Sequence, residues 1–192
     1  FYSNINGAHL SINNSTFSGN SADSAGAMQL QAGGSTMTAS ITNSTIAYNE
    51  ATTGAAGGLA NYGATITMDN SILAQNIANP SYYWIPDIVG GLASGSTHNI
   101  IGQTGGGGLS SVGTGNKFAV DPLLAPLGYY GGRTKTHALK SGSPALDAGE
   151  GSPGGYDQRG PGYARNYDLP TSDGASGYRD IGAYEASVGT TL

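Results

Sequence analysis

Apolar and polar residues alternate along several short segments of this chain, with a period of two. The alternation is clearest at residues 64–71, which read ATITMDNS. Such a pattern is typical of a β-strand that buries one face, whereas a helix repeats its apolar residues at every third or fourth position. Helical stripes are almost absent from the rest of the sequence, so we expect an all-β protein.

A short polar motif recurs at a nearly constant interval. It is seen as NNSTFSGN (13–20), TNSTIAYN (42–49) and DNSILAQN (69–76). The asparagine that directly precedes serine is Asn14, Asn43 or Asn70, and these three lie 29 and 27 residues apart. Apolar residues keep the same spacing around that asparagine in all three copies. They are Leu10, Ala39 and Ile66, then Ile12, Ile41 and Met68, and finally Phe17, Ile46 and Leu73.

This repeat predicts a stack of strands. One short strand pair per ~27 residues cannot bury its own apolar face, whereas stacked copies bury a continuous interior. The recurrent asparagines should then form ladders in which each side-chain amide bonds to the next, about 4.8 Å away, while glycines supply positive φ at the corners. The predicted ladder residues are Asn14, Asn43, Asn70, Asn20, Asn49 and Asn76.

Composition narrows the function classes. The 192 residues include 33 Gly, 8 Pro and 12 Tyr, with a net charge of only -5, which fits a turn-rich β protein. The twelve Asp and Glu residues outnumber the seven Lys and Arg residues, so we do not expect nucleic-acid binding. The absence of Cys excludes disulfides and thiolate metal sites, and no apolar run is long enough for a transmembrane helix.

The composition changes after the Gly-rich connection QTGGGGLSSVGTGN (103–116), and most of the charged residues follow it. We therefore divide the chain into a repeat region, 1–116, and a C-terminal region, 117–192. The second region carries DPLLAPLGYYGGRTKTHAL from residue 121, SGSPALDAGEG from 141, DQRG from 157 and RDIGAYE from 179.

Both regions resemble known bacterial families. FYSN and FSGN, each followed by a Gly-rich step, are similar to repeats of polymorphic outer-membrane proteins and right-handed parallel β-helix proteins. The ordered C-terminal motifs, with NIIG before them, resemble the choice-of-anchor Q domain. The resemblance implies a right-handed parallel β-helix of about four coils, closed by an irregular β-rich C-terminal cap. It also implies an exported bacterial protein that is extracellular or on the cell surface. The resemblance assigns no chemical reaction to the chain.

Charged residues of the C-terminal region allow two interpretations. An Asp/Arg cluster could be a metal or ligand site. Alternatively, it is a hydrogen-bonded network that braces a loop-rich cap, which is the interpretation we favour. No calcium-loop motif occurs, so a structural Ca²⁺ is compatible with the sequence but not indicated, and we expect no cofactor and no metal site. The residues concerned are Asp147, Asp157, Arg159, Asp180 and Glu185.

No catalytic residues are predicted. The four acidic residues of the repeat region fall out of register, the three His are far apart, and no G-x-S-x-G motif occurs. A carbohydrate-cleaving β-helix enzyme, of the polysaccharide lyase or glycoside hydrolase type, stays the alternative because loops could still bring carboxylates together. The four acids are Asp23, Glu50, Asp69 and Asp87, and the histidines are His9, His98 and His137.

One dense aromatic patch, in NPSYYWIPD (79–87), holds Tyr82, Tyr83 and Trp84. These residues could bind a sugar or a protein partner, which would make the chain a carbohydrate-binding module, or they could fold down on the solenoid. We expect a non-enzymatic structural or adhesive protein with a surface glycan or protein as ligand. Because Phe1 begins inside a repeat, we expect a fragment or processed product, or head-to-tail self-association through that end into a filament.

Overall fold

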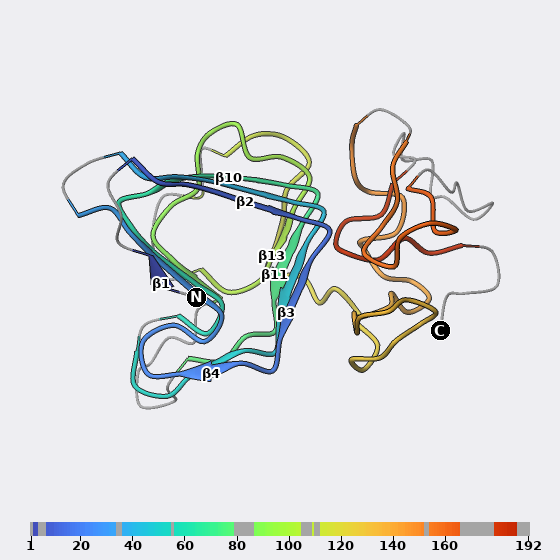
Figure 1. Ribbon diagram of the computed structural model, residues 1–192, viewed down its shortest axis with the longest axis horizontal. Helices are drawn as coiled ribbons and strands as arrows, with labels where there is room; N and C mark the ends of the chain where they lie inside the picture. The colour runs from blue at the N-terminus through green and yellow to red at the C-terminus, as the bar shows by residue number, and fades with distance from the viewer. Residues whose placement is uncertain are drawn as a thin grey trace.

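The computed structural model shows an all-β chain without an α-helix among its described residues. The strands of the described residues pair in parallel, each with its counterpart in a neighbouring repeat, which is consistent with a β-solenoid (Figure 1). Among those residues, antiparallel pairing is confined to isolated bridges after residue 120. The described residues are 2–3, 7–33, 36–54, 56–78, 87–104, 109, 112–151, 154–165 and 179–187.

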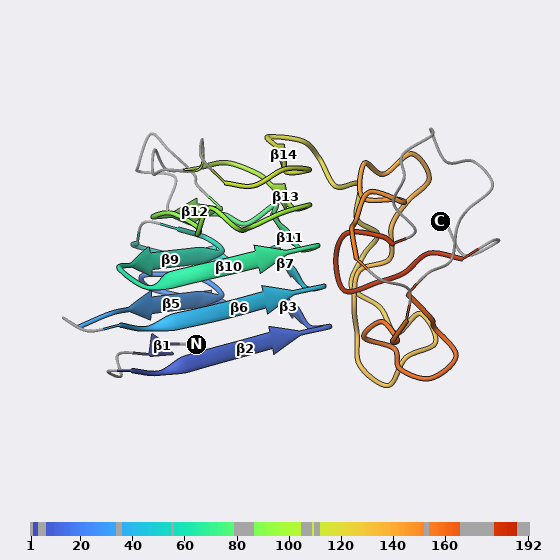
Figure 2. The ribbon, with the colours of Figure 1, turned by 90° about the horizontal axis from the view of Figure 1, so that it is seen from above.

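Four parallel sheets make up the stack, which we name A to D (Figure 2). Sheet A contains β1 (Tyr2–Ser3), β5 (Met28–Gln31), β9 (Leu59–Tyr62) and β12 (Ile88–Val89). Sheet B contains β2 (His9–Asn13), β6 (Thr38–Thr42) and β10 (Thr65–Asp69). Sheet C contains β3 (Thr16–Ser18), β7 (Thr45–Ala47), β11 (Ile72–Ala74), β13 (Ile100–Ile101) and β14 (Lys117–Phe118). Sheet D contains β4 (Ser21–Ala22) and β8 (Glu50–Ala51).

The interior of the stack consists of the apolar rows that the repeat predicts. Leu10 pairs with Ala39 and Ala39 with Ile66, and the rows through Ile41 and Ile46 continue in the same way. Because parallel strands are in register, equivalent residues of successive repeats lie above one another at the strand spacing. Ile41, Ile46, Ile66, Met68 and Leu73 are fully buried in one apolar cluster.

Sheet C differs from the other sheets because its strands β7 and β11 bury both faces. All three residues of β7 and all three of β11 are buried. Ile46 and Leu73 face the interior, whereas Ala47, Ile72 and Ala74 belong to a second apolar cluster with residues of the C-terminal region. The uninterrupted apolar run ILA of β11 is what a strand covered on both faces requires, whereas β7 keeps the polar Thr45 on its outer face.

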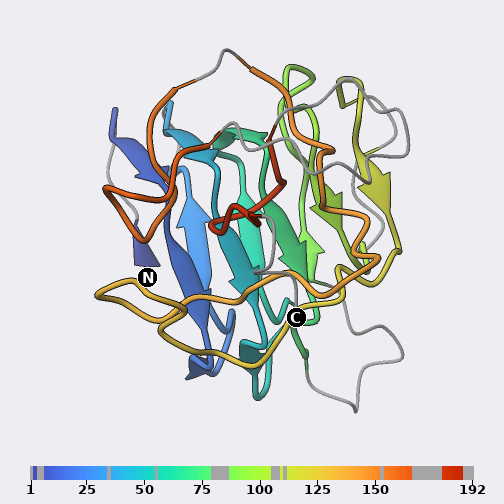
Figure 3. The same cartoon turned by 90° about the vertical axis from the view of Figure 1, so that its right-hand side faces the viewer.

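The C-terminal region lies along the flank of the stack that sheet C forms, not over its end (Figures 2 and 3). Leu124, Ala138, Leu139, Ile181 and Tyr184 pack on the outer face of sheet C. The sequence led us to expect a cap that closes the stack, and the observed placement differs: the region covers the outward apolar residues Ala47, Ile72 and Ala74 of sheet C. β14 still pairs with β13, so the stack extends past residue 116 by one strand.

An amide ladder inside the stack joins successive repeats. Asn20 Nδ2 donates to Asn49 Oδ1 at 2.8 Å, and Asn49 Nδ2 donates to Asn76 Oδ1 at 2.8 Å. The backbone N–H groups of Asn20 and Asn49 donate to the same two oxygens. Asn49 also bonds to the carbonyls of Phe17 and Ala47. Asn49 and Asn76 therefore each satisfy buried polar groups of two repeats at once.

Replacing Asn49 with Leu should lower the free energy of unfolding by about 3 kcal/mol, because buried partners in both neighbouring repeats lose their hydrogen bonds. Asn20→Leu is the matched control, since Asn20 is exposed and ends the ladder, and it should cost less than about 1 kcal/mol. Urea denaturation followed by circular dichroism measures both values. Equal costs for the two variants would contradict the ladder's role.

Candidate functional site

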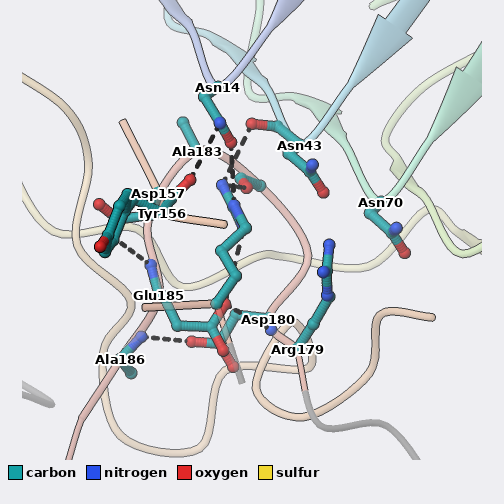
Figure 4. A network of polar contacts seen from close by, with 12 residues as sticks. Asn14, Asn43, Asn70, Tyr156, Asp157, Arg179, Asp180, Ala183, Glu185 and Ala186 are labelled. Atoms are coloured by element: carbon teal, nitrogen blue, oxygen red, sulfur yellow. Dashed lines mark hydrogen bonds and ion pairs between the residues drawn. The ribbon is translucent and has the colours of Figure 1, made fainter. Parts of the chain in front are cut away.

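The contact between the C-terminal region and the stack is where most of the polar side chains singled out by the sequence meet (Figure 4). On the first layer, Thr16 Oγ1 lies 2.8 Å from Thr136 Oγ1 and donates to Gln158 Oε1 at 2.6 Å. On the next layer, Thr45 Oγ1 accepts from the Ala183 N–H at 3.0 Å. The outward positions of sheet C are thus polar at β3 and apolar at β11.

The three turn asparagines do not form a ladder with one another, which corrects the prediction. The side chains of Asn14 and Asn70 bond to the C-terminal region, whereas Asn43 Nδ2 donates to Asn13 Oδ1 of the preceding repeat at 3.4 Å. Asn14, Asn43 and Asn70 adopt positive φ values of 47°, 48° and 47° at the corner between sheets B and C. This left-handed conformation turns their side chains out of the stack. Asn70 donates from Nδ2 to the Glu150 carbonyl and accepts from the Glu150 N–H, both at 2.7 Å.

Arg165 joins two repeats to the C-terminal region. Its side chain is 2% exposed, its Nε donates to Asn14 Oδ1 at 2.9 Å, and its Nη2 donates to the Gly182 carbonyl at 2.8 Å. Nη2 also reaches the Asn43 carbonyl at 3.4 Å, and Nη1 lies 3.5 Å from Glu185 Oε2. Burial lowers the pKa of Arg165, and the facing carboxylate of Glu185 opposes that shift.

The five predicted charged residues of the C-terminal region do come together, as a hydrogen-bonded network. Arg159 Nε donates to Asp157 Oδ2 at 2.8 Å, and the same oxygen accepts from the Glu185 N–H at 2.8 Å. Arg159 also donates to the Glu185 carbonyl. Its guanidinium carbon lies 3.8 Å from the ring centroids of both Tyr163 and Tyr184. Stacking on two rings and a bonded carboxylate fix this arginine as a brace.

Asp180 completes the network from its other side. Its Oδ1 accepts from the Asp147 N–H at 2.9 Å and its Oδ2 from the Ala186 N–H at 2.5 Å, while its own N–H donates to Glu185 Oε2. Burial raises the pKa of Asp180 to about 7, although these backbone donors favour the charged form. Between Asp180 and Ala186, Gly182 approaches the stack so closely that a Cβ would lie 2.9 Å from Ile72 Cδ1. Its φ of 112° also requires glycine.

A Ser–His pair lies within the same contact. Ser18 Oγ is 2.8 Å from His137 Nε2, and His137 Nδ1 is 2.7 Å from the Ala125 carbonyl. Nδ1 must donate to that carbonyl, so in the neutral ring Nε2 accepts from the Ser18 hydroxyl. Burial lowers the pKa of His137, which favours the neutral ring. The imidazole is 2% exposed and also packs against the Tyr48 ring at 5.0 Å.

An open groove of about 830 Å³ runs beside this contact, where sheet C ends and the chain leaves β14. Tyr48, Gln75 and Ile77 line one wall and Val120 and Asp121 line the other. Tyr48 and Gln75 occupy equivalent corner positions of successive repeats, with φ values of 57° and 63°. Gln75 Nε2 bridges the walls by donating to Asp121 Oδ1 at 3.1 Å.

Asp87 ends the amide ladder at the floor of the groove. Its Oδ1 accepts from Asn76 Nδ2 at 2.8 Å and from the Asn76 N–H at 2.7 Å, and its Oδ2 accepts from the Gln103 N–H at 2.7 Å. Burial raises the pKa of this carboxyl, and the Asn76 and Gln103 bonds oppose the shift. Gly102 is obligatory beside it, because a Cβ there would lie 2.2 Å from Asp87 Oδ2.

The other acidic and histidine candidates of the repeat region stay apart. Asp69 bonds to Thr97, and Asp23 accepts from Thr52. His9 bonds to Thr38, while His98 contacts Glu150 at 3.0 Å. Within the described ranges, no group of three or more His, Asp or Glu side chains is placed to hold a metal ion. The same ranges contain no helix long and apolar enough to cross a membrane. Tyr82, Tyr83 and Trp84 lie outside the described residues.

Sequence reasoning missed two sets of residues. One is Arg165, which belongs to no motif and is recognised only by its contacts. The other is a second ladder at the corner, in which each backbone N–H donates to the next side chain. The signal for it was present, because the residue after each turn asparagine is always small and polar. The ladder runs through Ser15, Ser44, Ser71, Asn99 and Asn116.

Comparison with known proteins gave no match to a family model, to a curated protein or to a solved structure.

Replacing Arg165 with Met should destabilise the chain by about 3–5 kcal/mol, because Glu185 and Asn14 lose a buried partner and the flank contact loosens. Arg133→Met is the matched control, since Arg133 is exposed, and it should change stability by less than about 0.5 kcal/mol. Urea denaturation measures the free energy, and chymotrypsin cleavage of the native protein reports loosening. An Arg165→Met protein as stable as the control would refute the role of this residue.

The contribution of His137 to stability should fall as the pH drops below about 6.5, because the unfolded chain binds a proton at His137 before the folded chain does. The pKa of His137 is lowered in the fold, so its contribution is present above the unfolded value and lost below it. The raised pKa of Asp180 acts oppositely between about 4 and 7, so the informative quantity is a difference between variants.

His137→Asn should therefore make the slope of the free energy of unfolding against pH, measured by urea denaturation between pH 5 and 7.5, less positive than in the parent by up to about 1.4 kcal/mol per pH unit. His9→Asn, at an exposed position, should leave the slope unchanged. If both variants keep the parent slope, His137 does not carry the effect.

Proposed function

We propose that this chain is a non-enzymatic structural or adhesive element of a bacterial cell surface or extracellular assembly. One observation carries the proposal: the buried carboxylates are used to hold the chain together. Asp87, Asp157 and Asp180 each accept hydrogen bonds from backbone N–H groups of distant segments. A carboxylate with its oxygens occupied in this way is a poor general acid, base or metal ligand.

The proposed architecture is a right-handed parallel β-helix of about four coils whose C-terminal region resembles the choice-of-anchor Q domain. In support, the motifs that carry this resemblance supply contacts of the C-terminal region with the stack: TKTHAL contributes Thr136 and His137, and RDIGAYE contributes Ala183 and the Gly182 N–H, which donates to the Asn70 carbonyl. Such contacts would make the stack rigid, because successive repeats bind to the same C-terminal region. A rigid stack is suited to act as a spacer or as a display element.

The proposal includes head-to-tail association through the first layer. Among the described residues, no strand pairs with the outer edges of β2, β3 and β4. Leu10 and Phe17 at this edge are only partly buried. An unpaired edge above an apolar interior favours addition of another layer of strands. A second copy offering its last layer could supply that layer, and such a heterologous contact would build a filament.

The Ser18–His137 pair favours a second candidate, a hydrolase. Its distances are those of a nucleophile and its base. Against this, the neighbouring N–H of Gly19 donates to the Tyr48 carbonyl, and that of Asn20 to Asn49 Oδ1, so neither is free to stabilise an oxyanion. The pair also lies inside the flank contact, where it holds β3 to the C-terminal region.

The proposed function predicts no turnover and concentration-dependent association in the same preparation. Pectin, alginate and neutral glycans, with and without Ca²⁺, should yield neither unsaturated products nor reducing ends, and a fluorophosphonate probe should not label Ser18. Sedimentation velocity should show growing head-to-tail oligomers. Labelling that Ser18→Ala abolishes, or turnover that a single Asp→Asn change abolishes, would replace the proposal with an enzyme, and a monomer at every concentration would refute the association.

A further inference from the structure

The groove beside the flank contact has features that the architecture does not use. Tyr48 is 43% exposed and Ile77 is 51% exposed, although the residues on either side of each in the sequence are buried. Large apolar surface left open in a concave site is a common mark of a binding site. The volume of about 830 Å³ is sufficient for a short chain of sugar rings or a comparable ligand.

Polar atoms in the groove also have bonding capacity left over. Gln75 Nε2 and the Leu123 N–H both donate to Asp121 Oδ1. No described residue bonds to Asp121 Oδ2, to Gln75 Oε1 or to the Tyr48 hydroxyl. Burial and, less strongly, the Asp121 carboxylate raise the pKa of Tyr48, so its hydroxyl keeps its proton and can donate. The groove therefore offers one donor and two acceptors next to two apolar side chains.

The charge of the groove restricts the ligand. Asp87 and Asp121 are the charged side chains among its described lining residues, and no Lys, Arg or His lies among them. An anionic ligand would meet uncompensated negative charge, which makes uronic-acid chains and phosphates poor candidates. The alternation of apolar contacts with free donors and acceptors fits a ligand whose own surface alternates C–H faces and hydroxyl edges.

We propose that this groove binds a neutral, hydroxyl-rich sugar chain, with Tyr48 and Ile77 against pyranose faces and Gln75 and Asp121 bonded to hydroxyls. This inference deepens the adhesive function proposed above and rests on it. The corner conformation supplies the geometry, because the positive φ values at Tyr48 and Gln75 direct successive side chains of the stack outward into one row. Asp121, at the start of the C-terminal region, faces this row and is fixed by the Leu123 N–H.

The test uses the full 192-residue chain and a defined panel of tetrasaccharides. Cellotetraose, laminaritetraose, maltotetraose, mannotetraose and xylotetraose are the neutral probes, and tetragalacturonate is the anionic one. Saturation-transfer NMR detects binding and isothermal titration calorimetry measures Kd. At least one neutral tetrasaccharide should bind with a Kd below about 1 mM, and tetragalacturonate should not. Failure of every neutral probe, or tighter binding of the anionic one, overturns the proposal.

Variants then locate the site. Tyr48→Ala should weaken binding of the neutral probe by at least about tenfold, since the ring contact is lost. Tyr62→Ala is the matched control, because Tyr62 is 40% exposed but lies on β9, away from the groove, and it should leave Kd unchanged. Asp121→Asn keeps the shape of the side chain and removes its charge. It should therefore reduce the ratio between the Kd of the anionic probe and the Kd of the neutral one.

Tyr48→Ala also removes the contact with His137, so Gln75→Ala provides a second variant that changes no interior packing. It should weaken neutral-sugar binding severalfold without altering the melting temperature by more than a few degrees. Unchanged binding in both Tyr48→Ala and Gln75→Ala would place the sugar elsewhere and refute this site. Binding together with cleavage would instead overturn the non-enzymatic function and leave the groove assignment standing, so the two failures are distinguishable.

Discussion

The structure depends on the need of sheet C to bury two faces at once. Ile46 and Leu73 face the interior of the stack, and Ala47, Ile72 and Ala74 face outward on the same strands. A single stack can cover only the first set. The chain therefore returns after β14 and lays residues from 121 onward along this flank. The placement of the C-terminal region, the clamp by Arg165 and the groove beside it all follow from this constraint, because each lies at the edge of the covered face.

Polar contacts give the flank contact its register. Apolar packing between alanines and isoleucines is nondirectional, so it would tolerate sliding along the stack. The left-handed asparagines remove that freedom, since Asn70 holds both backbone groups of Glu150 and Asn14 holds Arg165. Arg165 is in turn fixed by Gly182 and Glu185. A buried ion pair of this kind adds little net stability but strongly penalises any arrangement that separates its partners. Specificity of docking is therefore the property that these residues provide.

The period of the repeat predicted the stack from sequence, but it could not predict the contact between the C-terminal region and sheet C. Rows such as Leu10, Ala39 and Ile66 follow directly from spacing, because an in-register parallel ladder converts a sequence period into a spatial contact. Contacts such as Asn14 with Arg165 join residues 151 apart and belong to no period. One signal was nevertheless available: ILA (72–74) lacks the alternation of ATITMD, which indicates a strand covered on both faces. Asp87 belongs to no copy of the asparagine motif, so the period of the repeat did not identify it as the continuation of the amide ladder.

Asp87 shows how one residue links the interior of the stack to its surface. An asparagine in the same place could still accept from Asn76, but its amide nitrogen would then face the Gln103 N–H, which now donates to Asp87 Oδ2. A carboxylate is the one side chain of this size that accepts from both sides, so the ladder of amides ends at an acid. Its negative charge sits at the floor of the groove and adds to that of Asp121. The residue that satisfies the last ladder donors thus also sets the electrostatic potential of the surface at which a ligand would bind.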